Sequence, residues 1–391
     1  MRLDSSLGEE SQSLASVGAF LDPEYLYFHC DSRVESAKLS VRIAPTIRRD
    51  VSRHKPESPK VTSYSPAWWL PNGHSQTLWG KFLRRQPLKP TRVERLDTID
   101  GDFLDIHHTD SIRGAPVLVL LHGLEGTIRS HYIQALLGEA SRRHWGAAVL
   151  IFRSCGEQPN RAPRFYHSGE TTDLACAVDH LLATVPDSDL VLAGVSLGGN
   201  VLLKYLGELG EAVPARVKGA VAASVPFDLA RSAHHIDRGF SRLYQARFIR
   251  SLKRKAIAKL EIFPDLASRE TLAAAVTMVD FDNCFTAPVH GFRDAEDYYK
   301  RSSAIGWLKL IRVNTLLLNA VDDPFLPPLV LDEVRAIAAN NVALEVEFPL
   351  RGGHAGFVGG RNPFSPVYYL ERRVGHFLQR QLRAGTTTIG P

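Results

Sequence analysis

The stretch Val191–Lys204 reads VLAGVSLGGNVLLK and predicts a strand, a sharp turn and a helix. Ser196 lies on the turn, between Gly194 and Gly198. In a turn of this kind the backbone is crowded by the neighbouring strand and helix, so the flanking positions have no room for side chains. The serine is held in a strained conformation that presents its hydroxyl beyond the sheet. Ser196 is therefore a candidate nucleophile, although GxSxG also occurs in ordinary strand-to-helix turns.

Apolar runs and helical stripes alternate along most of the chain, which predicts an α/β fold with a mostly parallel central sheet and helices on both faces. The first two runs flank Asp100-Gly101 and predict a hairpin. The chain is expected to close with a helix around residues 368–382. The predicted strands are Val93–Thr98, Phe103–His108, Val117–Leu121, Ala147–Phe152, Leu190–Ala193, Ala220–Val225, Thr315–Leu318 and Leu344–Phe348.

The alternation stops once, between about Asp228 and Leu310, where basic helical stretches replace buried strands. We interpret residues 228–310 as a helical cap inserted between two parts of one core, residues 61–227 and 311–391. Residues 1–60 are polar and aperiodic, and we expect them to form a weakly ordered extension. The aromatic-rich segment Pro66–Lys81 is expected to pack against the core.

The composition is that of a globular protein large enough to bury a sizeable core. Of the 391 residues, 44% are hydrophobic and 23% are charged. The net charge of +5 is small and dispersed, which argues against a nucleic-acid partner. The four cysteines show no CxxC spacing, so neither a zinc site nor a disulfide framework is indicated. The longest apolar run, Val117–Leu121, is too short to cross a membrane, and the first residues lack signal-peptide features. We expect a cytoplasmic location.

A serine nucleophile needs a base, usually an imidazole that a carboxylate holds in one tautomer. In this kind of sheet the acid and the histidine should follow the serine on loops at the ends of later strands. Asp322 and Asp323 follow the strand Thr315–Leu318, and His354 follows the strand Leu344–Phe348. We prefer Asp323 as the acid, with Asp322 capping the turn, but the residue types leave both open.

Two backbone N–H groups should bind the oxyanion that forms when the serine attacks a carbonyl. One is that of Leu197, directly after Ser196. The other is expected from the loop His122–Gly126, HGLEG, where Leu124 is the predicted donor. No phosphate-binding glycine motif and no histidine–carboxylate cluster with metal-ligand spacing is present in the sequence, so we expect neither a cofactor nor a metal.

The basic stretch Arg238–Lys259 places apolar residues at helical spacing. It has two interpretations, the solvated outer face of a cap helix or a face that contacts anionic lipid head groups of a membrane. The basic residues between the apolar ones are Arg242, Arg250, Lys253, Arg254 and Lys255.

Taken together, these motifs resemble the α/β-hydrolase superfamily and, within it, the YheT-like (AB hydrolase 4) family of serine ester hydrolases. The similarity runs from about Ser65 to Leu382. It implies an α/β-hydrolase fold, Ser196, Asp323 and His354 as charge-relay residues, and a lipophilic or acyl ester as substrate. The motifs that carry it are NGHSQTLWGKFLRR, HGLEGTIRSHY, FRSCGEQPNR, YHSGETTDL, GVSLGGN, GFSRLYQ, HGFRDAEDYY, NAVDDPFLP and GGHAGF.

The favoured hypothesis is a cofactor-independent carboxylic ester hydrolase that acts on small-molecule esters with short to medium acyl chains. Acyl transfer to an alcohol on the same residues is an alternative. A non-catalytic binding protein with this fold is the third hypothesis, and the occupied serine, acid and histidine positions argue against it. The sequence does not indicate the oligomeric state.

Overall fold

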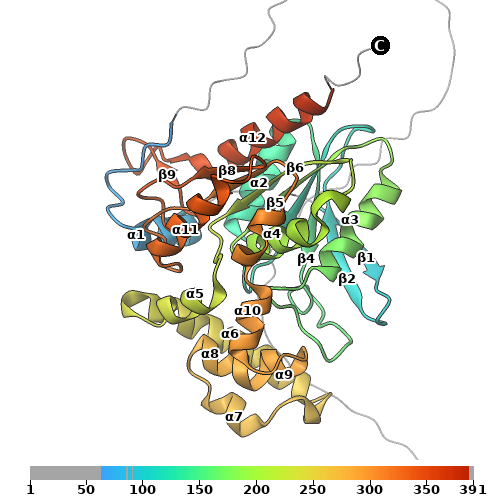
Figure 1. Ribbon diagram of the computed structural model, residues 1–391, viewed down its shortest axis with the longest axis vertical. Coiled ribbons are helices and arrows are strands. Elements are labelled where there is room, and N and C mark those ends of the chain that lie inside the picture. The colour runs from blue at the N-terminus through green and yellow to red at the C-terminus, as the bar shows by residue number, and fades with distance from the viewer. Residues whose placement is uncertain (1–62, 85–86, 90, 387–391) are drawn as a thin grey trace, which may run out of the picture. The chain divides into compact units, whose positions relative to one another are not determined.

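An eight-stranded sheet forms the centre of the computed structural model, which describes residues 63–84, 87–89 and 91–386 (Figure 1). The predicted extension, residues 1–60, lies outside the described residues. The strand order is β1-β2-β4-β3-β5-β6-β7-β8. In chain order the strands are β1 (Arg92–Asp97), β2 (Phe103–His108), β3 (Val117–Leu121), β4 (Gly146–Ile151), β5 (Leu190–Val195), β6 (Val217–Ala223), β7 (Thr315–Leu318) and β8 (Leu344–Glu347).

The sheet is parallel from β4 to β8, which confirms the predicted fold class. At the other edge, β1 and β2 form the predicted antiparallel hairpin, and β2 pairs antiparallel with β4. Two short strands, β9 (Val358–Gly359) and β10 (Val367–Tyr368), form a separate antiparallel pair. Because parallel strands end at the same edge, the loops that follow β3, β5, β7 and β8 meet there.

The bounds predicted for the strand Ala220–Val225 are wrong at both ends, because β6 spans Val217–Ala223. The apolar run continues to Val225, but Ser224 has a positive φ of 50°, at which the chain leaves the sheet. The amide side chain of Asn319 then bonds both backbone groups of Val225, in place of a strand partner. Sequence pattern alone does not reveal such a replacement.

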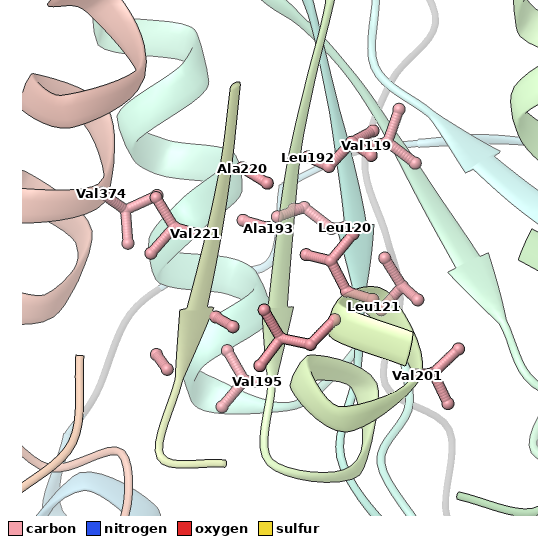
Figure 2. Close-up of a cluster of buried hydrophobic side chains, with 14 of the residues drawn as sticks. Val119, Leu120, Leu121, Leu192, Ala193, Val195, Val201, Ala220, Val221 and Val374 are labelled. Carbon is pink, nitrogen blue, oxygen red and sulfur yellow. The ribbon is translucent and has the colours of Figure 1, made fainter. Parts of the chain in front are cut away.

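Helices cover both faces of the sheet. On one face α2 (His131–Arg142) and α12 (Tyr369–Thr386) pack together, and α12 lies over β6. On the other face α4 (Leu197–Leu209) lies over β5 and β6 and contacts α3 (Thr172–Thr184), and α11 (Pro328–Ala338) contacts β8. Figure 2 shows Val374 of α12 beside Val221 of β6, whereas Val201 of α4 lies beyond β5. Every residue of β5 is buried, so the strand before Ser196 lies in the centre of the core.

Between β6 and β7 the described residues form helices and no strands, and α5 to α9 gather at one end of the sheet (Figure 1). This segment has its own buried cluster, which includes Leu252, Leu272 and Phe285. The division into a cap, residues 228–310, and a two-part core stays a prediction. The elements are α5 (Leu229–Ile236), η3 (Gly239–Ser241), α6 (Arg242–Leu260), η4 (Pro264–Leu266), α7 (Arg269–Ala274), α8 (Met278–Phe281), η5 (Asp282–Thr286), α9 (Ala287–Val289), α10 (Ala295–Ser302), η6 (Ala304–Gly306) and η7 (Leu308–Leu310).

The segment Pro66–Lys81 packs against the core as predicted. It contains α1 (Gly73–Leu78) and most of the π-helical turn η1 (Trp79–Leu83). Elsewhere in the chain, the short helical turn η2 (Gly210–Ala212) follows α4. The rings of Trp69 and Trp79 meet edge to face with their centroids 4.5 Å apart, and Ala67 donates its N–H to the carbonyl of Val358 at 2.9 Å.

Over the described residues, no helix combines the length and the apolar character needed to span a bilayer.

Arg153, two residues after the end of β4, ties three parts of the core together. Its guanidinium contacts the carboxylates of Asp173 on α3 at 2.7 Å, Asp102 at 2.8 Å and Asp100 at 2.9 Å. Asp102 and Asp173 are buried with it. Removing the guanidinium would leave these buried carboxylates without a cation in contact, and the cost of that loss is far larger than the net stabilisation that the ion pairs provide.

We therefore expect Arg153→Met to lower the free energy of unfolding by about 3 to 5 kcal/mol. The matched control is Arg113→Met, which breaks an exposed pair with Asp187 and should cost less than about 1 kcal/mol. Urea denaturation followed by circular dichroism measures both. Equal stability losses in the two variants would contradict the structural role of Arg153.

Candidate active site

Ser196 occupies the turn between β5 and α4 in a strained backbone conformation, with φ 57° and ψ −124°. Its own N–H donates to the carbonyl of Ala223 at 2.9 Å. A side chain at Gly194 would place its Cβ 2.3 Å from the carbonyl oxygen of Gly198, and one at Gly198 would lie 2.5 Å from that of His122. Both contacts are with backbone atoms that cannot move aside, so these positions require glycine.

His354 and Asp323 meet at the ends of the strands β8 and β7. The imidazole Nδ1 of His354 lies 3.0 Å and 3.1 Å from the two carboxylate oxygens of Asp323. The Asp323 side chain is almost fully buried and also accepts the N–H of Phe325 at 2.9 Å. A buried carboxylate on Nδ1 fixes the ring orientation and leaves Nε2 for another partner.

Asp322, the alternative acid, has a different set of contacts. One of its oxygens accepts the backbone N–H groups of Gly352 and Gly353, both at 2.8 Å. Burial raises the pKa of its carboxyl group above the ordinary value. Asp322 thus holds the loop that leads into His354, whereas Asp323 contacts the imidazole itself.

Hydroxyl groups from distant segments fix the backbone around His354. Thr77 of α1 accepts the N–H of His354 at 2.8 Å, and Ser224 accepts the N–H of Ala355 at 2.9 Å. The ring of Phe325 lies 4.1 Å from the imidazole ring. Thr77 and Ser224 were not predicted, because a hydroxyl that binds only a backbone N–H leaves no chemical signature in a sequence.

The loop His122–Gly126 lies directly against Ser196. A Cβ atom at Gly123 would lie 3.0 Å from the Cβ of Ser196. Two tyrosines hold this loop: Tyr132 accepts the N–H of Gly123, and Tyr166 accepts that of Glu125, each at 2.9 Å. These anchors too were not predicted.

Of the two predicted oxyanion donors, Leu124 lies on the loop that packs against Ser196 and Leu197 directly follows the serine. Leu124 falls between the two anchored amides of the loop. Leu197 is the first residue of α4, where the N–H groups of a helix have no intrahelical acceptor. Their role stays a prediction.

Two cavities meet at Ser196 and His354, and both side chains line each of them. The first, which we call the apolar cavity, has a volume of about 120 Å³. The second, which Lys81, Arg129 and Arg247 help to line and which we call the cationic cavity, has a volume of about 360 Å³. The apolar cavity is lined mainly by residues of the helical segment, including Leu229, Ile236, Phe248, Leu252, Phe281 and Phe285.

Part of the basic stretch on α6 points inward, which corrects the interpretation of its lysines as a solvated outer face. Lys255 contacts the carboxylate of Glu125 at 2.7 Å, and Lys253 donates to the carbonyl of Ala275 at 3.1 Å. Lys259 is buried and donates to the carbonyl of Asn160 at 2.6 Å. This burial lowers the pKa of its ammonium group to about 8.

In the described part of the chain, no group of three or more His, Cys, Asp or Glu side chains is arranged to hold a metal ion.

Comparison with known proteins agrees with this architecture. Residues 116–360 match the family model described as the alpha/beta hydrolase fold. The chain is 35% identical to "Putative esterase YheT" of Escherichia coli over 326 residues, which cover 82% of this chain and 94% of that protein. It is 29% identical to "Phospholipase ABHD3" of Mus musculus, over 84% of this chain and 81% of that protein. It is 32% identical to "Monoacylglycerol lipase" of Saccharomyces cerevisiae, over 63% of this chain and 56% of that protein.

The matched residues run from the residue before β3 to the one after β9 and so include the Ser196 turn and the loops that carry Asp323 and His354. On the strength of the family match and of its similarity to YheT, the chain belongs to the α/β-hydrolase family and, within it, to the YheT-like proteins.

Proposed function

We propose that this α/β-hydrolase cleaves carboxylic esters of small molecules through Ser196, His354 and Asp323. The observation that carries the proposal is the contact between His354 Nδ1 and the buried Asp323 carboxylate, in a site whose cavities Ser196 also lines. The relatives named as an esterase, a phospholipase and a lipase support an ester as the substrate class.

The first half of the reaction forms an acyl-enzyme. His354 Nε2 takes the proton from the Ser196 hydroxyl as the oxygen attacks the ester carbonyl, and Asp323 stabilises the resulting imidazolium. The N–H groups of Leu124 and Leu197 bind the oxyanion, each contributing about 3 kcal/mol to the transition state. The carbon–oxygen bond to the alcohol then breaks, and His354 gives its proton to the departing oxygen.

The second half releases the acid. A water molecule gives a proton to His354 and attacks the acyl carbon, and the bond to Ser196 breaks as the serine oxygen takes the proton back. The apolar cavity is the proposed site for the acyl chain. Each methylene group buried there is worth about 0.8 kcal/mol, or roughly fourfold in specificity, until the cavity is full.

Asparagine substitutions at the two aspartates test the proposed charge relay. We expect Asp323→Asn to lower kcat for p-nitrophenyl butyrate by about 10⁴-fold, because an amide cannot hold the imidazole in the required tautomer. Asp322→Asn keeps an oxygen that accepts the two glycine N–H groups and should change kcat by less than about tenfold.

Ser196→Ala gives the activity baseline for this comparison, and near-ultraviolet circular dichroism checks that each variant is folded. A folded Asp323→Asn variant with the activity of the wild type would contradict the assignment of Asp323. A larger loss in Asp322→Asn would transfer the role to Asp322.

A carboxyl group in the apolar cavity makes acyl-chain preference depend on pH. Asp282 is buried and accepts hydrogen bonds from Thr286 and Tyr299, each at 2.6 Å. Burial raises the pKa of its carboxyl group to about 6. Below that pH the group is neutral, and above it the cavity holds a charge whose desolvation opposes an apolar chain.

We therefore expect the ratio of kcat/KM for the p-nitrophenyl decanoate and butyrate esters to fall by about tenfold from pH 5 to pH 8, since desolvating a buried polar group costs on the order of 1 to 3 kcal/mol. Using the ratio cancels the pH dependence of the catalytic steps that both esters share. Asp282→Asn should hold the ratio constant and near its low-pH value. A constant ratio in the wild type would show that Asp282 does not influence the acyl chain.

We also propose a peripheral contact between the start of α6 and anionic membranes. Phe240 and Leu243 are exposed there beside the exposed Arg242 and Arg247, the combination expected of an interfacial surface. Leu243→Glu should reduce sedimentation with phosphatidylserine vesicles at low salt. Leu329→Glu, a change at an exposed leucine of α11, is the matched control. Absence of sedimentation by the wild type would remove this proposal.

A further inference from the structure

The peptide that carries the proposed oxyanion donor, the N–H of Leu124, is fixed at its carbonyl end by the core. The carbonyl oxygen of Gly123 accepts the N–H of Gly126 at 2.9 Å and lies 2.8 Å from Nδ1 of His122. Burial lowers the pKa of His122 to about 4, so the neutral ring can accept the N–H of Phe152 on Nε2, at 3.1 Å, and donate from Nδ1 to Gly123. Because a trans peptide points its C=O and N–H in opposite directions, these bonds set the direction of the Leu124 N–H.

The next peptide of the loop is held by the hydroxyl group of Tyr166. This hydroxyl accepts the N–H of Glu125 and donates to the carboxylate of the same residue, both at 2.9 Å. Glu125 has a positive φ of 55°, a conformation that favours glycine and that other residues keep only where the surrounding structure enforces it. The carboxylate and the tyrosine together supply that support, and so hold Leu124, the residue before Glu125, in the turn.

The carboxylate of Glu125 is held in turn by helix α6. Lys255 donates to one of its oxygens at 2.7 Å, and Ser251 donates to the other. These two residues follow Glu125 by 130 and 126 positions in the chain, and their spacing of four places them on one face of the helix. The Glu125 side chain is only 9% exposed, so its charge depends on these partners more than on water.

Lys255 lies behind the loop and away from the proposed substrate. Among the described residues that line the apolar and cationic cavities, Lys255 does not occur. Besides Glu125, its ammonium group contacts the sulfur of Cys155 at 3.4 Å and lies 5.9 Å from the centre of the Tyr166 ring. An effect of Lys255 on the reaction therefore has to pass through Glu125 and the loop.

We propose that Glu125 is a positioning residue for ester hydrolysis, and that its carboxylate aligns the Leu124 N–H with the oxyanion. Lys255 and Ser251 hold this carboxylate, so helix α6 takes part in forming the oxyanion site. The inference rests on the proposed function and adds residues that act on its chemical step. Because the oxyanion forms only as the reaction proceeds, a misaligned donor slows that step and leaves binding of the ester nearly unchanged.

The double variant Lys255→Met/Ser251→Ala removes both contacts between α6 and the Glu125 carboxylate. We expect it to lower kcat for p-nitrophenyl butyrate by about 10- to 100-fold, since misalignment forfeits part of what complete removal of an oxyanion donor costs. KM should change by less than about threefold. A trifluoromethyl ketone forms an oxyanion on Ser196, so its inhibition constant should rise by the same factor by which kcat/KM falls.

Lys253→Met is the matched control, because Lys253 lies on the same helix but donates to the carbonyls of Ala273 and Ala275. Its kcat and inhibition constant should equal those of the wild type. Lys255→Arg keeps a cation for the carboxylate and should retain most of the activity that Lys255→Met loses. Wild-type kcat in the double variant, an equal loss in Lys253→Met, or a change in KM alone would overturn the proposal; near-ultraviolet circular dichroism checks folding, and Lys255→Met replaces a double variant that does not fold.

Hydrogen exchange separates this inference from the proposed function, because it needs no catalysis. Mass spectrometry of peptides from the Ser196→Ala protein measures the amide exchange of residues 122–126. We expect exchange there to become at least about tenfold faster when Lys255→Met/Ser251→Ala is added, and to stay the same with Lys253→Met. An unchanged rate would overturn the hold of α6 on the loop, whatever the activity. A wild type that cleaves no ester would refute the proposed function and with it the role of Glu125 in hydrolysis, whereas faster exchange would still support the hold of α6 on the loop.

Discussion

The tight contact between the backbones of β5, α4 and the loop after β3 is the constraint on which the site depends. Ser196 keeps a left-handed φ because Gly194 and Gly198 let these segments approach closely, and because the fully buried β5 anchors the turn in the core. Strain of this kind costs on the order of 1 to 3 kcal/mol and persists only where surrounding structure enforces it. The same contact brings the loop of Gly123 and Leu124 against the serine, so the nucleophile and the proposed oxyanion donors are positioned together.

The remaining parts of the site are held by hydrogen bonds from side chains to backbone groups. Tyr132 and Tyr166 fix the loop after β3, and Thr77, Ser224 and Asp322 fix the loop of His354. None of these five contacts the proposed reacting atoms in the mechanism described above. They act by holding backbone segments from opposite ends of the chain at fixed positions, which is what a preorganised oxyanion site requires.

The sequence predicted the features that follow from local pattern. The serine turn, the hairpin and the parallel strands were identified because glycine spacing and apolar periodicity reflect the backbone directly. The choice between Asp322 and Asp323 could not be made in this way, since both follow β7 and only the direction of each side chain distinguishes them. The inward orientation of Lys255 and Lys259 likewise depends on which carboxylate and carbonyls the folded core presents to α6. The end of β6 was misplaced because Asn319, almost a hundred residues later, bonds the backbone that the apolar run suggested was still in the sheet.

Ser196 and His354 line two cavities of different chemistry, and the acyl part of the substrate is proposed to occupy the apolar cavity. This account requires above all that Ser196 is an activated nucleophile. Labelling of the folded protein with a fluorophosphonate, followed by peptide mass spectrometry, measures this directly. The account predicts a single modification on Ser196 that is absent from the Ser196→Ala protein. A folded wild type that remains unlabelled, or a label that persists in Ser196→Ala, would contradict it.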